Sequence, residues 1–291
     1  MITRRQGAAI AMAVLAGPPA ARAASGKPGT LAEDLAQIES ASGGRLGLAA
    51  LDTGSGARIL HRADERFPLC STFKLLAAGA VLARADAGQE SLDRRIRFRP
   101  EDLVTYSPAT GPRAGGEGMT LAELCEAAMT LSDNTAGNLL LSAIGGPAGL
   151  TGFARRLGDP VTRLDRVETA LNEALPGDPR DTTTPEAMVA DLQALALGDA
   201  LSPGGRAQLI AWLVGTRTGD TRIKAGLPAG WRFGDKTGSG ERGTANDVGL
   251  FWPPGRPPVL FAAYLTETEA PMERRNATHA AIGRALAAAL G

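Results

Sequence analysis

Apolar and polar positions follow two different periods along the chain. Residues 45–67 (RLGLAALDTGSGARILHRADERF) predict two strands around the turn DTGSG. Strand-like stretches return at 231–240, 244–253 and 258–267, and the Ala-rich stretch 275–291 predicts a closing helix. Both ends of the chain are therefore expected to supply strands to the fold.

The middle of the chain changes to helical spacing. Thr120, followed three residues later by Glu123, is a capping-box signature, and apolar residues then recur at helical intervals. Further helix starts are indicated at Thr184-Pro185 and Ser202-Pro203, where Pro takes the first helical position. The periodicity lapses between residues 164 and 184, and a segment of this length without periodicity is usually functional or disordered.

Strands at both chain ends with helices between them predict an α+β fold (an α/β sandwich). We expect an antiparallel sheet of about five strands, built from both chain ends and flanked by helices, plus an all-helical lobe. Residues 24–66 and 216–291 would form the α/β lobe and residues 67–215 the all-helical lobe, with the active site between them. The sequence contains no internal repeat, and no linker divides it cleanly.

The first 23 residues differ from the rest of the chain. Arg4 and Arg5 precede a short apolar stretch from Gly7 to Gly17, and a small-residue site ends at Ala23. This layout is typical of a cleavable export signal, and the paired arginines suggest the twin-arginine route. The alternative is a first core helix, but this stretch ends in Gly-Pro-Pro and is too short to span a bilayer. We expect a periplasmic or secreted protein with no membrane segment in its mature form.

Composition narrows the classes of function. Of 291 residues, 44% are hydrophobic and 4% aromatic, and 31 basic residues balance 31 acidic ones. Balanced charge and few aromatic residues argue against nucleic-acid binding. The two His and two Cys show no zinc-ligand spacing, so we expect no metal site, and two cysteines are too few for a disulfide scaffold.

The stretch CSTFK places Ser71 three residues before Lys74, where a helix is expected to begin. Residues at i and i+3 share one helix face, so the amine can reach the hydroxyl. A serine needs a base to become nucleophilic, and a lysine with a lowered pKa can serve. Taken alone, the pair is a weak signal and favours a structural interpretation, in which Ser71 caps the helix and the charge of Lys74 reaches solvent.

Two further motifs follow in the chain. LSDNTAGN supplies a hydroxyl and an amide, Ser132 and Asn134, in a break between helical stretches. GDKTGSG places Lys236 and Thr237 on an expected strand, and Gly238 leaves room there for a substrate backbone. Each motif alone is weak, but the three in this order form a strong combined signal.

The order S-x-x-K, S-D-N, K-T-G resembles that of the penicillin-recognising serine enzymes over nearly the whole mature chain. RVETALN, with Glu168 and Asn172 four residues apart, is similar to the signature of class A β-lactamases, in which a carboxylate and an amide hold one water. Penicillin-binding proteins lack this pair at this place. The resemblance also implies that Arg166 and Asp181 close an Ω-loop at 163–181, which would fix the position of Glu168.

The resemblance implies a role for each polar residue of these motifs. Ser71 is the nucleophile that forms an acyl-enzyme, and Glu168 activates the water that hydrolyses it. Backbone N–H groups of Ser71 and Ser239 form the oxyanion hole. The other implied catalytic residues are Lys74, Ser132, Asn172 and Lys236, and the implied substrate-binding residues are Tyr106, Asn134, Thr237, Gly238, Ser239 and Arg222.

Two of these assignments rest on single positions. Tyr106 matches the aromatic residue that walls one side of the cleft in the family, although an ordinary surface tyrosine is the alternative. Arg222 matches an arginine that some members place behind the K-T-G strand, whereas others carry it on the following strand, where this chain has Ala245. We expect Arg222 to supply the guanidinium for the substrate carboxylate; the alternative is a surface arginine.

The cysteines are expected to be free and buried. Cys70 matches a family cysteine that sometimes pairs with a residue just after K-T-G, and that position is Gly240 here. Cys125 matches a family cysteine whose usual disulfide partner would lie two turns beyond Ser71, and that position is Ala78 here. Because the Cys70 pairing is associated with carbapenem hydrolysis, the resemblance implies activity on penicillins and cephalosporins but not on carbapenems. Ser239 in place of a smaller residue weakly favours cephalosporins.

The expected function is hydrolysis of the β-lactam amide bond, conferring antibiotic resistance, by a monomer that needs no metal or organic cofactor. The rivals are a D-alanyl-D-alanine carboxypeptidase or other penicillin-binding protein, and a sensor that is acylated once. Glu168 argues against both. A Ser-His-Asp hydrolase would need His61 or His279, and the sequence has no G-x-S-x-G motif.

Overall fold

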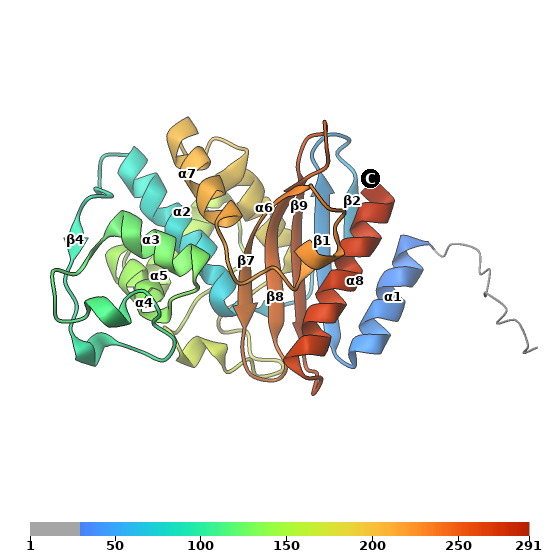
Figure 1. Ribbon diagram of the computed structural model, residues 1–291, viewed down its shortest axis with the longest axis horizontal. Coiled ribbons are helices and arrows are strands. Elements are labelled where there is room, and N and C mark those ends of the chain that lie inside the picture. The colour runs from blue at the N-terminus through green and yellow to red at the C-terminus, as the bar shows by residue number, and fades with distance from the viewer. Residues whose placement is uncertain (1–29, 291) are drawn as a thin grey trace, which may run out of the picture.

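The computed structural model describes residues 30–290 (Figure 1). Its main element is a five-stranded antiparallel sheet in the order β2-β1-β9-β8-β7. The strands are β1 (Arg45–Asp52), β2 (Arg58–His61), β7 (Arg232–Ser239), β8 (Ala245–Trp252) and β9 (Val259–Thr266). The predicted α+β fold, with a sheet drawn from both chain ends, is confirmed.

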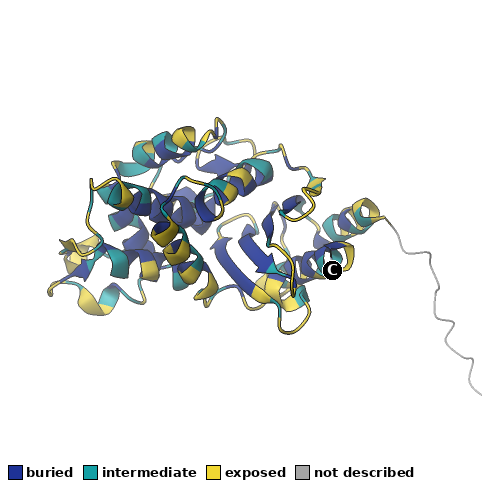
Figure 2. Cartoon of the chain, turned by 90° about the horizontal axis from the view of Figure 1, so that it is seen from above, coloured by how far each residue is buried: buried dark blue, intermediate teal, exposed yellow. Residues whose placement is uncertain are grey.

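The central strands β1, β8 and β9 are buried on both faces, and their alternate residues pack in different cores, whereas the edge strand β2 is partly exposed. On β9, Leu260, Ala262 and Tyr264 belong to the larger core shared with the internal helices. Phe261 and Ala263 belong to a second core against the first and last helices. This is the period of two expected for a strand packed on both sides, and the central strands are dark blue in Figure 2.

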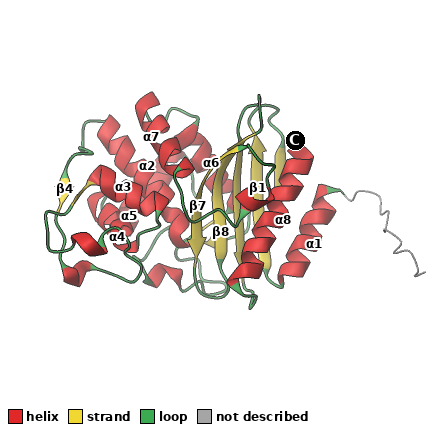
Figure 3. Ribbon diagram, in the orientation of Figure 1, coloured by secondary structure: helices red, strands yellow, loops and turns green. Residues whose placement is uncertain are grey.

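Helices cover the two faces unequally (Figure 3). α1 (Leu31–Ser42) and α8 (Met272–Leu290) lie side by side on one face, and α6 (Pro185–Ala196) packs on β1 and β9 from the other. The remaining helices gather beside β7 around α2, whose residues 73–82 are all buried. They are α2 (Phe73–Asp86), α3 (Leu121–Thr130), α4 (Asn134–Ala143), α5 (Gly146–Leu157) and α7 (Pro203–Val214).

Four short strands form two small ladders that connect these helices. One pairs β3 with β6 and the other pairs β4 with β5. Their bounds are β3 (Phe67–Pro68), β4 (Arg95–Ile96), β5 (Met119–Thr120) and β6 (Thr182–Thr183). The first ladder matters for the site, because it joins the residues just before Ser71 to the end of the irregular segment 163–181.

The expected helix starts are confirmed at three places. Thr120 and Glu123 form a complete capping box, and Thr184 and Ser202 accept backbone hydrogen bonds as N-caps. The last helix begins at Met272, earlier than expected, and α1 was not foreseen although it too opens with a capping box.

The boundary between two lobes stays a prediction. α6 lies within the range 67–215 assigned to the helical lobe, yet it packs directly on the sheet. The expected export signal at 1–23 lies outside the described residues. Within residues 30–290, no helix has the length and apolar character needed to cross a membrane.

Candidate active site

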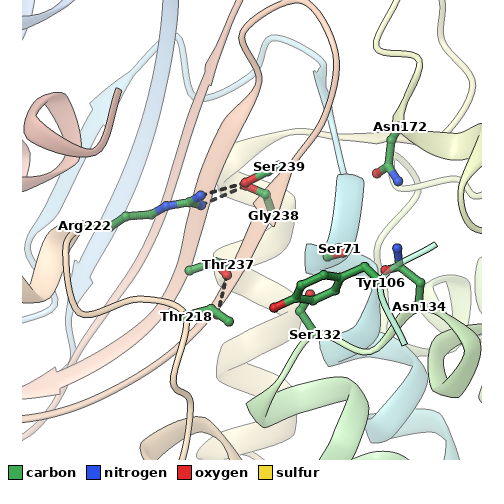
Figure 4. A pocket seen from close by; sticks show the side chains of 10 residues that line it. All are labelled: Ser71, Tyr106, Ser132, Asn134, Asn172, Thr218, Arg222, Thr237, Gly238 and Ser239. Carbon is green, nitrogen blue, oxygen red and sulfur yellow. Dashed lines mark hydrogen bonds between the residues drawn. The ribbon is translucent and has the colours of Figure 1, made fainter. Parts of the chain in front are cut away.

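A cleft of about 310 Å³ opens between the end of β7 and the helices around α2 (Figure 4). Motifs that are far apart in the sequence meet there. Ten residues line it, namely Ser71, Tyr106, Ser132, Asn134, Asn172, Thr218, Arg222, Thr237, Gly238 and Ser239. Nine of them were predicted from the sequence, and Thr218 was not.

Ser71 lies in a short 3₁₀ turn, Cys70–Thr72, that leads directly into α2. The expected α-helix thus begins two residues later, at Phe73, and Lys74 sits in its first turn. Lys74 Nζ donates to Ser71 Oγ at 2.8 Å, and the lysine is fully buried. The reading of Ser71 as a helix cap with a solvent-reaching lysine is wrong, because Ser71 makes no capping bond and the amine is enclosed.

Lys74 is the centre of a buried polar cluster. Its Nζ also donates to the Ser132 carbonyl at 3.0 Å and to Asn134 Oδ1 at 2.6 Å, and lies 2.9 Å from Glu168 Oε1. Burial lowers the pKa of Lys74, and the nearby Glu168 carboxylate partly offsets that effect. The amine is thereby made a better proton acceptor than an exposed lysine.

Glu168 reaches Ser71 from the irregular segment. Its Oε1 lies 3.2 Å from Ser71 Oγ, and its Oε2 accepts from Asn172 Nδ2 at 2.6 Å. Asn172 Oδ1 is buried and accepts no hydrogen bond from residues 30–290, which leaves it available to a water. Asn138, which no sequence motif indicated, holds both backbone groups of Glu168 with its side-chain amide: its Oδ1 accepts from the Glu168 N–H at 2.8 Å and its Nδ2 donates to the Glu168 carbonyl at 3.0 Å.

The irregular segment is closed by the ion pair expected from the sequence. Arg166 Nε donates to Asp181 Oδ2 at 2.6 Å, and Asp181 is 1% exposed. Asp181 Oδ1 also accepts from the backbone N–H groups of Asp165 and Arg166. Arg166 makes a second ion pair with Glu173 at 2.5 Å, for which the sequence carried no signal.

Lys236 on β7 meets Ser132, which lies in the turn before α4. Lys236 Nζ donates to Ser132 Oγ at 3.0 Å. Burial lowers the pKa of Lys236 well below its ordinary value, and the charge of Lys74 acts in the same direction. The turn that carries Ser132 is fixed by Asp133, a buried N-cap of α4 that also accepts two hydrogen bonds from Thr110.

Strand β7 ends against the nucleophile turn. A Cβ on Gly238 would lie 3.0 Å from the Leu69 carbonyl, so glycine permits this close approach. A Cβ on Gly240 would lie 2.6 Å from Cys70 Sγ. Asn246 on β8, unrecognised in the sequence, donates to the Leu69 carbonyl and ties the sheet to the same turn.

Arg222 is 5% exposed and approaches the cleft through Ser239. Its Nη2 donates to Ser239 Oγ at 2.7 Å, and its Nη1 donates to the Gly238 carbonyl at 2.8 Å (Figure 4). The surface-arginine alternative is therefore wrong. Among residues 30–290, no carboxylate lies within 4 Å of this guanidinium, so its charge remains available to an anion in the cleft.

Tyr106 and Asn134 form the opposite wall. Tyr106 lines the cleft with 56% of its surface exposed and adopts a φ of 66°, in the left-handed region. Asn134 Nδ2 donates to the Thr105 carbonyl at 2.9 Å while its oxygen accepts from Lys74. Cys70 and Ser132 also have positive φ values, so backbone strain gathers around the nucleophile.

The prediction of two free, buried cysteines is confirmed. Burial raises the pKa of both thiols, with the Glu168 charge adding to the effect at Cys70. Neither thiol is thereby suited to act as a nucleophile at neutral pH.

A serine hydrogen-bonded to a buried lysine, in one cleft with a hydroxyl-bearing turn and a K-T-G strand, defines a serine acyl-transfer enzyme of the penicillin-recognising class. The carboxylate and amide of Glu168 and Asn172 add the means to activate a water.

The model of the "Beta-lactamase enzyme family" matches residues 30–290. Beta-lactamase AST-1 of Nocardia asteroides is 54% identical over 256 residues, covering 88% of this chain and 82% of that protein. Beta-lactamase CTX-M-8 of Citrobacter amalonaticus is 49% identical over 252 residues, covering 87% and 86%. The chain belongs to the β-lactamase enzyme family.

Solved structures of class A β-lactamases are also similar to this chain. An ancestral class A β-lactamase is 62% identical with a TM-score of 0.88, covering 90% of this chain and 100% of that one. The putative class A β-lactamase PenP of Rhodopseudomonas palustris is 61% identical, with the same TM-score and the same coverage. The protein is a class A serine β-lactamase, which hydrolyses β-lactams.

Proposed function

We propose that Ser71 Oγ attacks the β-lactam carbonyl and that its proton passes to Lys74 or, through a water, to Glu168. The 2.8 Å between Ser71 Oγ and Lys74 Nζ supports direct transfer to the lysine. Glu168 Oε1 lies 3.2 Å from the same hydroxyl, so transfer through a water would require the two side chains to move apart when the substrate binds. The carbonyl oxygen becomes an oxyanion that the backbone N–H groups of Ser71 and Ser239 stabilise. Ser71 is in the first turn of a helix, where N–H groups lack intrahelical partners.

Collapse of the tetrahedral intermediate breaks the amide C–N bond and leaves an ester on Ser71. The departing nitrogen takes a proton from the Ser132 hydroxyl, which the Lys236 amine supports at 3.0 Å. Ser132 is reprotonated by the proton that Ser71 released, so Lys74 and Glu168 return to their starting states before deacylation. The substrate carboxylate is held at the end of β7 by Lys236, Thr237 and Ser239, with the Arg222 charge behind Ser239. Tyr106, Gly238 and Asn134 shape the rest of the cleft, and Asn134 meets the acylamide side chain.

Deacylation distinguishes hydrolysis from one-time acylation. Glu168 takes a proton from a water oriented by Asn172, and the resulting hydroxide attacks the ester carbonyl. The ester C–O bond then breaks, and the departing Ser71 Oγ takes back the proton held by Glu168. The convergence of Glu168, Asn172 and Ser71 in one buried cluster is the observation that carries the proposal. A carboxypeptidase or a sensor would not require this pair.

The experiment compares native enzyme with Glu168→Gln. The native enzyme should turn over a chromogenic cephalosporin many times, whereas Glu168→Gln should acylate once and retain the adduct as added mass on the intact protein. Glu241→Gln, an exposed carboxylate beside the same loop, is the matched control and should keep native turnover. A single burst from the native enzyme, or rapid deacylation by Glu168→Gln, would contradict the proposal.

We further propose penicillins and cephalosporins as substrates and do not expect turnover of a carbapenem, since Gly240 stands opposite Cys70. Parallel turnover assays with one member of each group test this assignment.

Export through residues 1–23 and a monomeric mature enzyme are also proposed. Periplasmic fractionation and light scattering of the purified protein test them.

A further inference from the structure

Thr218 lies on the segment that connects α7 to β7 and runs along this edge strand. The segment is fastened to the strand on both sides of Thr218. Thr216 Oγ1 donates to the Asp235 carbonyl at 2.5 Å, and Arg222 Nη1 donates to the Gly238 carbonyl at 2.8 Å. Thr218 is therefore held in a defined place beside the cleft rather than on a free loop.

The side chain of Thr218 meets that of Thr237. The two Oγ1 atoms are 2.6 Å apart, and both threonines line the cleft (Figure 4). Among residues 30–290, this is the single hydrogen bond made by either hydroxyl. Nothing else in the described chain therefore decides which of the two donates.

A bound carboxylate would decide the direction. A carboxylate only accepts hydrogen bonds, and the Thr237 hydroxyl has one proton to give. When Thr237 donates to the substrate, the bond between the threonines must run from Thr218 to Thr237.

Ser239 also makes a hydrogen bond with a neighbouring side chain, but here the direction of the bond is fixed. A guanidinium only donates, so Ser239 Oγ must accept from Arg222 and its own proton is left for the cleft. The end of β7 then presents two hydroxyls that each receive a hydrogen bond from behind and donate forward. Chains of hydrogen bonds of this kind strengthen the outer donor.

We propose that Thr218 is a positioning residue for the substrate carboxylate, which acts by donating to Thr237 and thereby directing the Thr237 proton into the cleft. The proposal rests on the proposed function, in which Thr237 binds that carboxylate. It assigns to Thr218 a share of the affinity for anionic β-lactams without direct contact with the reacting bond.

The test is Thr218→Val, which keeps the shape of threonine and removes its hydroxyl. One neutral hydrogen bond is lost, so KM for a cephalosporin should rise by about 2- to 12-fold. Because the carboxylate is bound in both the ground and the transition state, kcat should stay within about 2-fold of native. Thr218→Ser should restore the native KM, and Thr218→Ala should repeat the valine result if the valine variant folds poorly.

A double-mutant cycle separates positioning from general packing. Thr237→Val should raise KM more than Thr218→Val does, and adding Thr218→Val to it should have no further effect. An unchanged KM in Thr218→Val, or the same penalty with and without the Thr237 hydroxyl, would overturn the proposal. Native enzyme is assayed first, because absence of turnover there would refute the proposed function, and the role of Thr218 would fall with it.

Discussion

Asn138 on α4 holds the backbone of the residue expected to activate the hydrolytic water. Its Nδ2 donates to the Glu168 carbonyl at 3.0 Å, and its Oδ1 accepts from the Glu168 N–H at 2.8 Å. Asn138→Ala removes both bonds and leaves the Glu168 carboxylate and Ser71 chemically intact. The change therefore tests how far deacylation depends on the position of Glu168.

The expected magnitude follows from these two bonds. Each contributes about 0.5–1.5 kcal/mol net, so their joint loss amounts to about 1–3 kcal/mol. Glu168 is 3% exposed, so the released backbone groups find little water and the upper half of this range is expected. If the whole of this loss goes into misplacing the Glu168 carboxylate, deacylation slows by about 30- to 150-fold.

Stopped-flow kinetics with a chromogenic cephalosporin separate the two half-reactions. The burst reports acylation, which should stay within about 3-fold of native if Lys74 serves as the base. The later steady rate reports deacylation, which should fall, and intact-protein mass should reveal accumulated acyl-enzyme. Ser142→Ala, an exposed residue on the same helix, is the matched control and should leave both rates native.

Two outcomes would refute this reasoning. Equal slowing of acylation and deacylation would mean that Asn138 supports the whole site rather than Glu168. Native deacylation combined with a lower unfolding temperature would mean that the two bonds contribute to stability alone.

Two further predictions concern buried charge. Arg166→Ala removes a charge-assisted hydrogen bond to Asp181, which keeps its backbone donors. The free energy of unfolding measured in urea should therefore fall by about 1.5–3 kcal/mol, and hydrogen exchange at residues 163–181 should become faster. An unchanged unfolding curve would contradict this prediction. Burial raises the pKa of Asp235 to about 6 and that of its neighbour Asp247 well above its ordinary value, so the native state keeps protons that the unfolded chain releases. The stability due to this pair is complete below about pH 4 and declines as pH rises through about 6. Asp247→Asn should therefore become more stable relative to native between about pH 5 and pH 8, measured by urea unfolding, and a difference independent of pH would refute this.

Local patterns were sufficient to predict most elements of the fold. Strand alternation and caps such as Thr120 act between residues a few positions apart, and their signal survives in one sequence. The same holds for Ser71 and Lys74, whose spacing nearly fixes their contact once a helical turn forms. The 3₁₀ geometry of that turn was not predictable, because it depends on how β7 and β8 pack against it.

The sequence alone determined the order of the elements, the identity of the chemical groups and the resemblance that their order carries. Only the tertiary structure decided that Glu168 lies against a serine 97 residues earlier in the chain. It also decided that Asn138 and Thr218, an asparagine and a threonine with no local signal, form hydrogen bonds with Glu168 and Thr237. The physical reason is that periodicity and capping depend on neighbours in sequence, whereas a hydrogen bond across a cleft depends on the packing of helices against a sheet.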